Sequence, residues 1–160
     1  MIRPATPADA AAFCRIYNPY VAGSLVTFET APVETETMAG RIRKVTAGFP
    51  WLAWQEAGTV LGYAYAFRWK EREAYRFAVE TTVYVAGEAV GRGIGSHLYE
   101  ALIPALGEGG FHTALAGIAL PNPASVALHE KFGFAQVARL PQVGWKLDRW
   151  VDVGYWARVL

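Results

Sequence analysis

The stretch Val90-Gly91-Arg92-Gly93-Ile94-Gly95-Ser96 decides the fold, because it joins a predicted strand to a predicted helix. The strand ends in the alternating residues Thr82–Val85, and the helix extends from Ser96 to Leu106. Backbone N–H groups of the turn and of the first helical residues therefore point toward one spot, where hydrogen bonds and the helix dipole attract a phosphate. Gly93 and Gly95 have no side chain to block that ligand. The stretch predicts a phosphate-binding corner in an α/β domain.

Other glycine-rich patterns compete with this interpretation. A loop of glycines is often only a connection between two elements, and a strand, a glycine turn and a helix also occur in dinucleotide-binding folds. The spacing here is not G-x-G-x-x-G, and only about half of a βαβαβ unit follows the turn, which disfavours a dinucleotide site. A P-loop is excluded because no Gly-Lys-Ser or Gly-Lys-Thr occurs in the chain.

The composition indicates one domain with a large core. Of the 160 residues, 53% are hydrophobic and only 18% are charged, which excludes a disordered chain. The chain has six Trp, eight Tyr and eight Phe residues, more large rings than a small interior needs. Some of them are therefore expected at a subunit interface, as in a homodimer.

The net charge, the hydrophobic pattern and the cysteine content limit the kinds of partner and the location that we expect for the chain. A net charge of +1 without a basic run gives no support for a nucleic-acid partner. No apolar stretch reaches membrane-spanning length, and no signal-peptide core follows Met1, so we expect no membrane partner and a cytoplasmic location. Cys14 is the only cysteine, which precludes an internal disulfide, and its helical pattern favours a small buried side chain over a reactive thiol.

Hydrophobic periodicity and turn residues divide the chain into alternating helices and strands. Helices are predicted from a cap at Thr6-Pro7 until Pro19 and Gly23 disturb the pattern, then over Thr35–Val45 and Ser96–Leu106, and from Asn122-Pro123 to Gly133. Strands are predicted over Trp51–Gln55, Thr59–Phe67, Tyr75–Val85, Ala114–Leu120, Phe134–Arg139 and part of Trp145–Val159. Without repeats or linkers, residues 1–160 form a single α/β domain.

The strand, the glycine turn Gly91–Gly95 and the helix together resemble the acetyl-CoA motif of the GNAT superfamily of N-acetyltransferases. Val90 stands where that family prefers Gln or Arg, so one side-chain contribution is missing while the backbone cradle remains. Asn122 matches a family Asn that contacts the pantetheine arm, and His129 stands where a Tyr is frequent. The resemblance implies a central mixed, mostly antiparallel twisted sheet flanked by helices, with strands splayed to admit acetyl-CoA, and no metal.

A series of further segments is similar to one subgroup, the phosphinothricin or methionine sulfoximine N-acetyltransferases. The segments, in order and at matching intervals, are Ile2–Thr6, Val26–Phe28, Tyr63–Tyr65, Trp69–Tyr75, Glu80–Val85, Asn122–Glu130 and Trp150–Trp156. The series covers nearly the whole chain. It implies a homodimer that acetylates the α-amino group of a small-molecule amine such as phosphinothricin, methionine sulfoximine or methionine sulfone.

The implied reaction needs a base, because a free amine is mostly protonated near neutral pH. We assign Glu80, at the start of the central strand, as general base, acting directly or through water. The alternative for Glu80 is a surface ion pair with an arginine, namely Arg72, Arg76 or Arg92. His129 is expected to be an acid/base partner or a donor to the leaving thiolate; the alternative is a helix histidine satisfied by a neighbour.

Binding residues follow from the same resemblance. For acetyl-CoA they are Val83, Tyr84, Val85, Gly91, Arg92, Gly93, Ile94, Gly95, Ser96 and Asn122. For the acceptor they are Phe28, Lys70, Glu71, Arg72, Glu80, Thr81, Thr82 and Tyr84, with Lys146 and Trp150 as further candidates. Arg72 is expected to bind the acidic oxygens of the acceptor through paired hydrogen bonds from its guanidinium group. The alternative for residues 70–73 is a charged hairpin tip.

Two other functions stay open. The same fold and co-substrate could serve a different acceptor, such as a polyamine, an aminoglycoside or a protein N-terminus. A non-catalytic acetyl-CoA-binding sensor is the third hypothesis, in which Glu80 and His129 would be dispensable. For the enzyme, no cysteine lies near the motif to carry an acetyl group, which predicts direct attack in a ternary complex.

Overall fold

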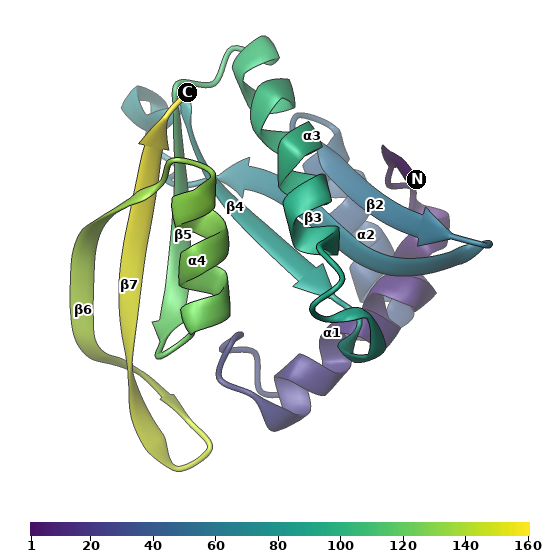
Figure 1. The fold of residues 1–160 in the computed structure, drawn as a ribbon, viewed down its shortest axis with the longest axis horizontal. Helices are drawn as coiled ribbons and strands as arrows, with labels where there is room; N and C mark the ends of the chain where they lie inside the picture. Colours follow the sequence, from purple (N-terminus) through teal and green to yellow (C-terminus); the bar gives the residue numbers. More distant parts are fainter.

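A seven-stranded mixed sheet forms the centre of the computed structural model, which describes residues 1–160 (Figure 1). The strand order is β1-β2-β3-β4-β5-β7-β6, and all neighbours are antiparallel except β4 and β5. The strands are β1 (Ile2–Pro4), β2 (Trp51–Glu56), β3 (Thr59–Arg68), β4 (Ala78–Val85), β5 (Thr113–Leu120), β6 (Ala135–Lys146) and β7 (Arg149–Val159). The mixed, mostly antiparallel sheet inferred from the sequence is confirmed.

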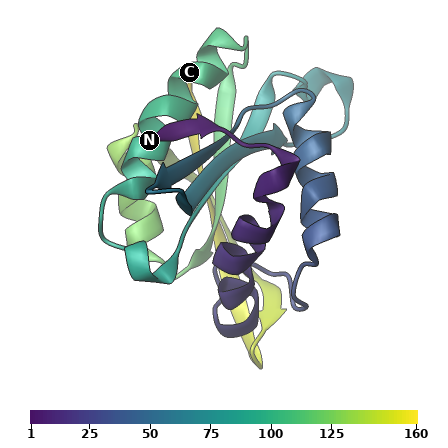
Figure 2. The ribbon, with the colours of Figure 1, turned by 90° about the vertical axis from the view of Figure 1, so that its right-hand side faces the viewer.

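Helices cover both faces of this sheet, which gives three layers (Figure 2). The helices are α1 (Ala10–Gly23), α2 (Thr35–Thr46), α3 (Ile94–Glu108) and α4 (Pro123–Lys131). Phe13 of α1 and Ile42 of α2 are fully buried on one face, and Leu98 and Leu102 of α3 are fully buried on the other. These apolar positions recur at helical spacing, so each helix buries one stripe against the sheet. No helix combines the length and apolarity that crossing a membrane requires.

The first helix begins as its sequence predicts and then continues farther. Thr6 and Asp9 form a capping box around the short 3-10 helix Pro7–Asp9, which leads directly into α1. Asp9 is buried and also pairs with Arg3, whose Nη2 lies 2.7 Å from the carboxylate. Pro19 lies inside α1 and does not end it, although we expected it to disturb the helical pattern. Cys14 is buried in this helix, as expected.

Strands β4 and β5 pair only at their beginnings. Three parallel pairs, from Ala78↔Thr113 to Glu80↔Leu115, join them, and no pairing follows. β4 continues to pair with β3 as far as Val85, and β5 continues to pair with β7 as far as Leu120. The two strands therefore diverge beyond Glu80, as Figure 1 shows. This splaying, which the family resemblance implied, leaves two strand edges facing one another across a gap.

The C-terminal hairpin differs most from the sequence prediction. β6 was expected to end at Arg139 but extends to Lys146, because an irregularity between Leu140 and Gly144 lets the strand resume. Asp152 of β7 pins this irregularity by accepting hydrogen bonds from the Gln142 N–H at 2.8 Å and from the Arg139 guanidinium at 2.9 Å. The resulting long hairpin projects beyond the helices (Figure 2).

Smaller differences concern the ends of elements. β4 begins at Ala78 rather than Tyr75, because residues Glu73–Tyr75 form a 3-10 helix. The third helix begins at Ile94 rather than Ser96 and continues beyond its predicted end at Leu106 to include Gly107. The helix instead ends at Glu108, before Gly109 and Gly110.

Candidate active site

A groove with a volume of about 620 Å³ occupies the gap between β4 and β5. It is lined by the diverging parts of both strands, by the glycine turn and by α4. Nine of the ten residues predicted to bind acetyl-CoA line it: Val83, Tyr84, Val85, Gly91, Gly93, Ile94, Gly95, Ser96 and Asn122. The structure thus brings the two sequence motifs to one continuous surface.

At one end of the groove, five backbone N–H groups have no acceptor within the chain. They belong to Gly91, Gly93, Ile94, Gly95 and Ser96. Gly91 and Gly93 adopt φ angles of +83° and +79°, a left-handed conformation that disfavours residues with a Cβ. Unpaired N–H donors at the N-terminus of a 15-residue helix form a favourable site for a phosphate group. This cradle fits the pyrophosphate of acetyl-CoA.

Arg92 is the one predicted cofactor residue that does not line the groove. Its guanidinium donates to the carboxylate of Glu56, with an N···O distance of 2.6 Å, beside the turn that joins β2 and β3. Val90 does line the groove but is apolar and 62% exposed. The turn therefore offers backbone donors to the groove without a cation of its own.

Asn122 has a structural contact as well as a place in the groove. Its Oδ1 accepts the N–H of Ser125 at 3.2 Å and so caps the N-terminus of α4. Its Nδ2 group makes no hydrogen bond within the chain and is free to donate to a ligand in the groove. Capping therefore fixes the orientation of the Asn122 side chain at the edge of the groove.

A smaller pocket of about 340 Å³ meets the groove. Val26, Gly117 and Ala119 line both cavities. Most of its lining residues are hydrophobic, and the full set is Leu25, Val26, Phe28, Glu80, Gly117, Ala119, Leu140, Val143, Val153 and Tyr155. Glu80 is the only charged residue among them. The geometry therefore provides a long groove and a compact pocket that join beside one carboxylate.

Burial raises the pKa of Glu80, while a hydrogen bond from the Gly117 backbone and the charge of Lys70 lower it to a smaller extent. The alternative of a surface ion pair does not occur in this structure. Arg76 pairs with Glu73, Arg92 pairs with Glu56, and no cation lies within 4 Å of the Glu80 carboxylate. A partly desolvated carboxylate at the mouth of a pocket has the properties of a general base.

His129 is buried, and both ring nitrogens have partners. Nδ1 lies 2.7 Å from the carbonyl oxygen of Ser125, which can only accept, so Nδ1 carries a proton. Burial lowers the pKa of His129 and favours the neutral ring, whose Nε2 then accepts the hydroxyl of Tyr99 at 2.9 Å. Tyr99 also contacts Thr81 Oγ1 at 3.1 Å, and both His129 and Thr81 line the groove. This network joins α4, α3 and β4 beneath the cofactor groove.

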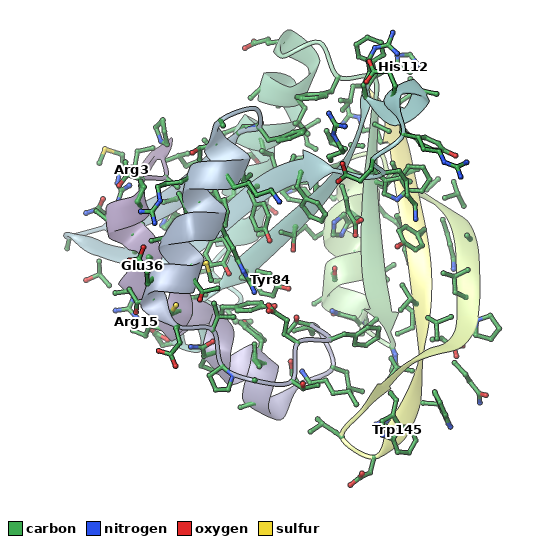
Figure 3. The ribbon with its side chains drawn as sticks, turned by 180° about the vertical axis from the view of Figure 1, so that it is seen from behind. Arg3, Arg15, Glu36, Tyr84, His112 and Trp145 are labelled. Carbon is green, nitrogen blue, oxygen red and sulfur yellow. The ribbon has the colours of Figure 1, made fainter.

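The other predicted acceptor residues fall into two groups. Lys70, Glu71 and Arg72 lie in the exposed loop between β3 and β4 and line neither cavity. Thr81, Thr82 and Tyr84 line the groove, and Phe28 lines the pocket. Tyr84 projects toward α1, where its ring packs edge-on against Tyr17 with centroids 4.9 Å apart (Figure 3).

The segment Leu25–Phe28, which forms a wall of the pocket, is fastened to the C-terminal hairpin. Lys146, a further acceptor-binding candidate, does not line the pocket. Its side chain is buried, and its ammonium group donates a hydrogen bond to the carbonyl oxygen of Thr27 at 2.7 Å. The Phe28 ring lies against Gly144, where a Cβ would be 2.3 Å from Cζ of the ring. Trp150, the other candidate, is exposed and packs against Trp145, with ring centroids 4.9 Å apart. Figure 3 shows Trp145 on the projecting hairpin.

Four pocket residues on the hairpin were not identified from the sequence: Leu140, Val143, Val153 and Tyr155. Leu140 and Val143 lie beyond the predicted end of β6, so nothing placed them near Glu80. Val153 and Tyr155 lie within Trp150–Trp156, a segment already similar to the subgroup, and this similarity was the available signal.

Comparison with known proteins identifies the family of this chain. The model of the Acetyltransferase (GNAT) family matches residues 12–134. Phosphinothricin N-acetyltransferase of Streptomyces viridochromogenes is 42% identical over 157 residues, which cover 98% of this chain and 86% of the relative. An L-methionine sulfoximine/L-methionine sulfone acetyltransferase of Salmonella typhimurium is 37% identical over 96% of this chain and 91% of its own length.

A solved structure also matches the whole fold. The phosphinothricin acetyltransferase from Sinorhizobium meliloti, solved in complex with AcCoA, superimposes with a TM-score of 0.96 at 36% identity. The match covers 100% of this chain and 88% of that one. These similarities extend across the strands, the turn and the hairpin that form the two cavities.

Proposed function

Because the chain belongs to the GNAT acetyltransferase family, we propose that it transfers the acetyl group of acetyl-CoA to the α-amino group of a small amino-acid analogue. Candidate acceptors are phosphinothricin, methionine sulfoximine and methionine sulfone, which the names of its relatives contain. The observation that carries this proposal is the junction of the groove and the pocket beside Glu80. A long carrier in the groove and a small amine in the pocket can meet there.

Acetyl-CoA supplies the acetyl group as an activated thioester. The free N–H groups of the turn bind its phosphates, Asn122 Nδ2 donates to the pantetheine arm, and the diverging edge of β4 at Val83–Val85 holds that arm. A backbone amide of this edge also stabilises the negative charge that develops on the thioester oxygen. The chain therefore positions the carbonyl carbon through backbone groups.

Glu80 removes the proton that the acceptor amine must lose, directly or through one water molecule. The neutral amine nitrogen then forms the new C–N bond as the C–S bond breaks, and the second proton of the nitrogen passes to the departing thiolate, which leaves as the thiol. Phe28 and the apolar residues of the pocket surround the acceptor side chain, while Lys70 and Arg72 of the neighbouring loop attract its acidic groups. Glu71, Thr81, Thr82 and Tyr84 complete the proposed acceptor site.

His129 is proposed as the acid/base partner on the thiolate side. Its neutral ring accepts the Tyr99 hydroxyl at Nε2, so it can act as an acid through the hydroxyls of Tyr99 and Thr81 only after Nε2 has taken up the amine's second proton. The same contacts also serve a positioning role, because they fix α4 against β4. A His129→Gln variant separates the two roles. An acid role predicts a changed pH profile of kcat at unchanged CoA affinity, whereas a positioning role alone predicts a lower melting temperature and an unchanged profile.

We further propose that two copies pair through the C-terminal hairpin. β6 lies at the edge of the sheet and is mostly exposed, and apolar side chains cluster on the hairpin, among them Val143, Trp145, Leu147 and Trp150. An exposed apolar edge strand is a favourable surface for self-association. Light scattering tests the pairing, which Trp145→Lys should weaken.

An acceptor panel with acetyl-CoA tests the function. Free thiol should be released with methionine sulfoximine, methionine sulfone or phosphinothricin, and the N-acetyl product should be detected by mass spectrometry. If none of these is modified while a polyamine, an aminoglycoside or a peptide N-terminus turns over, the acceptor class is wrong. Binding of CoA without turnover of any amine would favour the sensor hypothesis.

A further inference from the structure

One wall of the acceptor pocket comes from a connection without regular secondary structure. Leu25, Val26 and Phe28 line the pocket from the segment Leu25–Phe28, which follows α1 and reaches toward the C-terminal end of β5 (Figure 1). Residues 25–33 make no hydrogen bond between backbone groups, in contrast to the strands that supply the rest of the pocket. A wall without such bonds opens easily unless side chains hold it. The shape of the pocket therefore depends on what fastens this segment.

One carboxylate joins the segment to both neighbouring helices. Glu29, the residue after Phe28, accepts two hydrogen bonds from the guanidinium of Arg41 in α2, at 2.5 and 2.9 Å. It also accepts a hydrogen bond from the hydroxyl of Tyr17 in α1. The Tyr17 oxygen lies 2.6 Å from Oγ1 of Thr27, which belongs to the segment itself. Four side chains from α1, α2 and their connection therefore meet at one point.

The geometry of this contact suits it to holding a loop, although neither charged partner is fully buried. The side chains of Arg41 and Glu29 are 41% and 35% exposed, and a simple ion pair at such exposure contributes little. Here two parallel N–H···O bonds fix the orientation of the carboxylate as well as its position. Hydrogen bonding from Arg41 lowers the pKa of Glu29, against the effect of burial, so the carboxylate is charged at neutral pH. The buried Tyr17 ring is in turn fixed edge-on against Tyr84 of β4.

We propose that Glu29 and Arg41 are positioning residues for the acceptor site, because they hold the segment Leu25–Phe28 in place as a wall of the pocket. Tyr17 completes the contact. The inference rests on the proposed function, which assigns the pocket to the acceptor amine. Neither Glu29 nor Arg41 lines the pocket or the groove. The pair therefore acts on the acceptor through Phe28, whose ring lines the pocket.

Loss of the pair should change the acceptor KM more than kcat. If the segment is ordered in only a fraction of the molecules, the apparent affinity for the acceptor is reduced by that fraction. Glu80 is held by β4 and not by this segment, so the chemical step in a molecule with bound acceptor stays the same. The glycine turn belongs to another part of the chain, so the Kd of CoA should not change.

An ion pair between a helix and a loop also has a simpler explanation, namely that it only stabilises the fold. The same helix offers a matched control. Arg43, two residues after Arg41, pairs with Glu36 at 2.7 Å, and this pair lies entirely within α2 and lines neither cavity. If the Glu29–Arg41 pair only stabilised the fold, Arg41→Met would lower the melting temperature and, like Arg43→Met, would leave the acceptor KM unchanged.

Steady-state kinetics at saturating acetyl-CoA, with the best acceptor of the panel, test the proposal. Arg41→Met should raise the acceptor KM by about three- to tenfold and keep kcat within about twofold, as expected for loss of one charge-assisted contact at a partly exposed site. Arg43→Met should change neither parameter. Glu29→Arg should raise KM further, because it places two guanidinium groups together. The double variant Glu29→Arg/Arg41→Glu restores an ion pair of reversed polarity and should lower KM again.

Proteolysis under native conditions separates this proposal from the proposed function, because it needs no acceptor. Chymotrypsin should cleave after Phe28 faster in Arg41→Met than in wild type or Arg43→Met, since the segment opens more often. Equal cleavage in all three proteins would overturn the proposal, as would an unchanged KM of Arg41→Met or a double variant no better than Glu29→Arg. If wild type modified no amine while cleavage responded as expected, the proposed function would fail and the positioning of the segment by Arg41 would stand.

Discussion

The cofactor groove and the acceptor pocket adjoin one another, yet they are built in different ways. The groove presents main-chain groups at the glycine turn, where N–H groups are free, and along the diverging edges of β4 and β5. The pocket is formed by side chains from five separate parts of the chain, from Leu25 to Tyr155. Backbone geometry tolerates many side-chain changes, whereas a pocket of side chains changes shape with each one. The groove should therefore be robust and the pocket adaptable.

The largest effect is expected where the two cavities meet. Glu80→Gln removes the proposed base and keeps the size of the side chain, so kcat/KM should fall by about 100- to 10,000-fold. Steady-state thiol release with the best acceptor measures this loss, and titration with CoA should give an unchanged Kd. If Glu80→Gln retained the wild-type turnover rate, Glu80 would not be the general base.

The pocket should be changed selectively by Gly144→Ala. The added methyl group would lie 2.3 Å from the Phe28 ring, which is partly exposed and can move into the pocket. We expect the KM of the acceptor to rise by about tenfold, because overpacking costs roughly 1–3 kcal/mol. The Kd of CoA should stay the same.

The control for this substitution is Gly40→Ala, since a Cβ at Gly40 meets nothing within 4 Å and the residue lies inside α2. It should leave both parameters unchanged. A rise in the CoA Kd of Gly144→Ala that matches the rise in acceptor KM would mean that the two cavities are not independent.

The groove should be changed selectively by Gly93→Ala, which is expected to weaken the binding of CoA and to leave the acceptor KM unchanged. The φ angle of +79° at this residue disfavours a side chain by roughly 1–2 kcal/mol, so the turn must shift and misalign its N–H groups. The expected result is a CoA Kd about tenfold higher, measured by titration, with the acceptor KM unchanged at saturating acetyl-CoA. An effect on acceptor KM alone would contradict the assignment of the turn.

The pH dependence should report the environment of Glu80. Burial raises its pKa, so the acid limb of kcat/KM should lie above the range of an ordinary glutamate, about 4.3, with activity increasing as the pH rises. The same shift means that the folded state binds this proton more tightly than the unfolded state. The associated stability is present at low pH and is lost as the pH rises through the folded-state pKa.

Glu80→Gln should therefore melt at a higher temperature than wild type at neutral pH, and this difference should vanish at low pH. Melting curves recorded across the pH range test this sign. A lower melting temperature of the variant at neutral pH would show that the carboxylate is a stabilising group rather than a desolvated one.

The smallest effect is expected for Arg92→Ala, although Arg92 lies within the phosphate-binding turn. Its side chain pairs with Glu56 outside the groove, and exposed ion pairs contribute little. The Kd of CoA should change by no more than about twofold in a titration at physiological salt. A larger increase would mean that the Arg92 guanidinium contacts CoA. The turn would then bind the ligand through a side chain as well as through its backbone.

Much of the fold could be predicted from the sequence, because its signals are local. The caps at Thr6 and Asn122 and the glycines at Gly91 and Gly93 act within a few residues, and the structure has each of them in place. Along Glu80–Val85 successive side chains alternate between the two faces of β4, so Tyr84 packs against Tyr17 of α1 while Thr81 contacts Tyr99 of α3 on the opposite face. Errors occurred at element ends, as at Arg139, where a distant residue, Asp152, lets the strand continue.

For the site, the sequence by itself determined the proposed phosphate cradle, since a turn and the helix after it are contiguous and their N–H groups need no distant partner. Only the tertiary structure decided which side chains face the ligands. Arg92 is drawn away by Glu56, and Lys146 is buried against the carbonyl of Thr27. A side chain's direction depends on partners far along the chain, whereas a backbone donor's direction depends on its own φ and ψ.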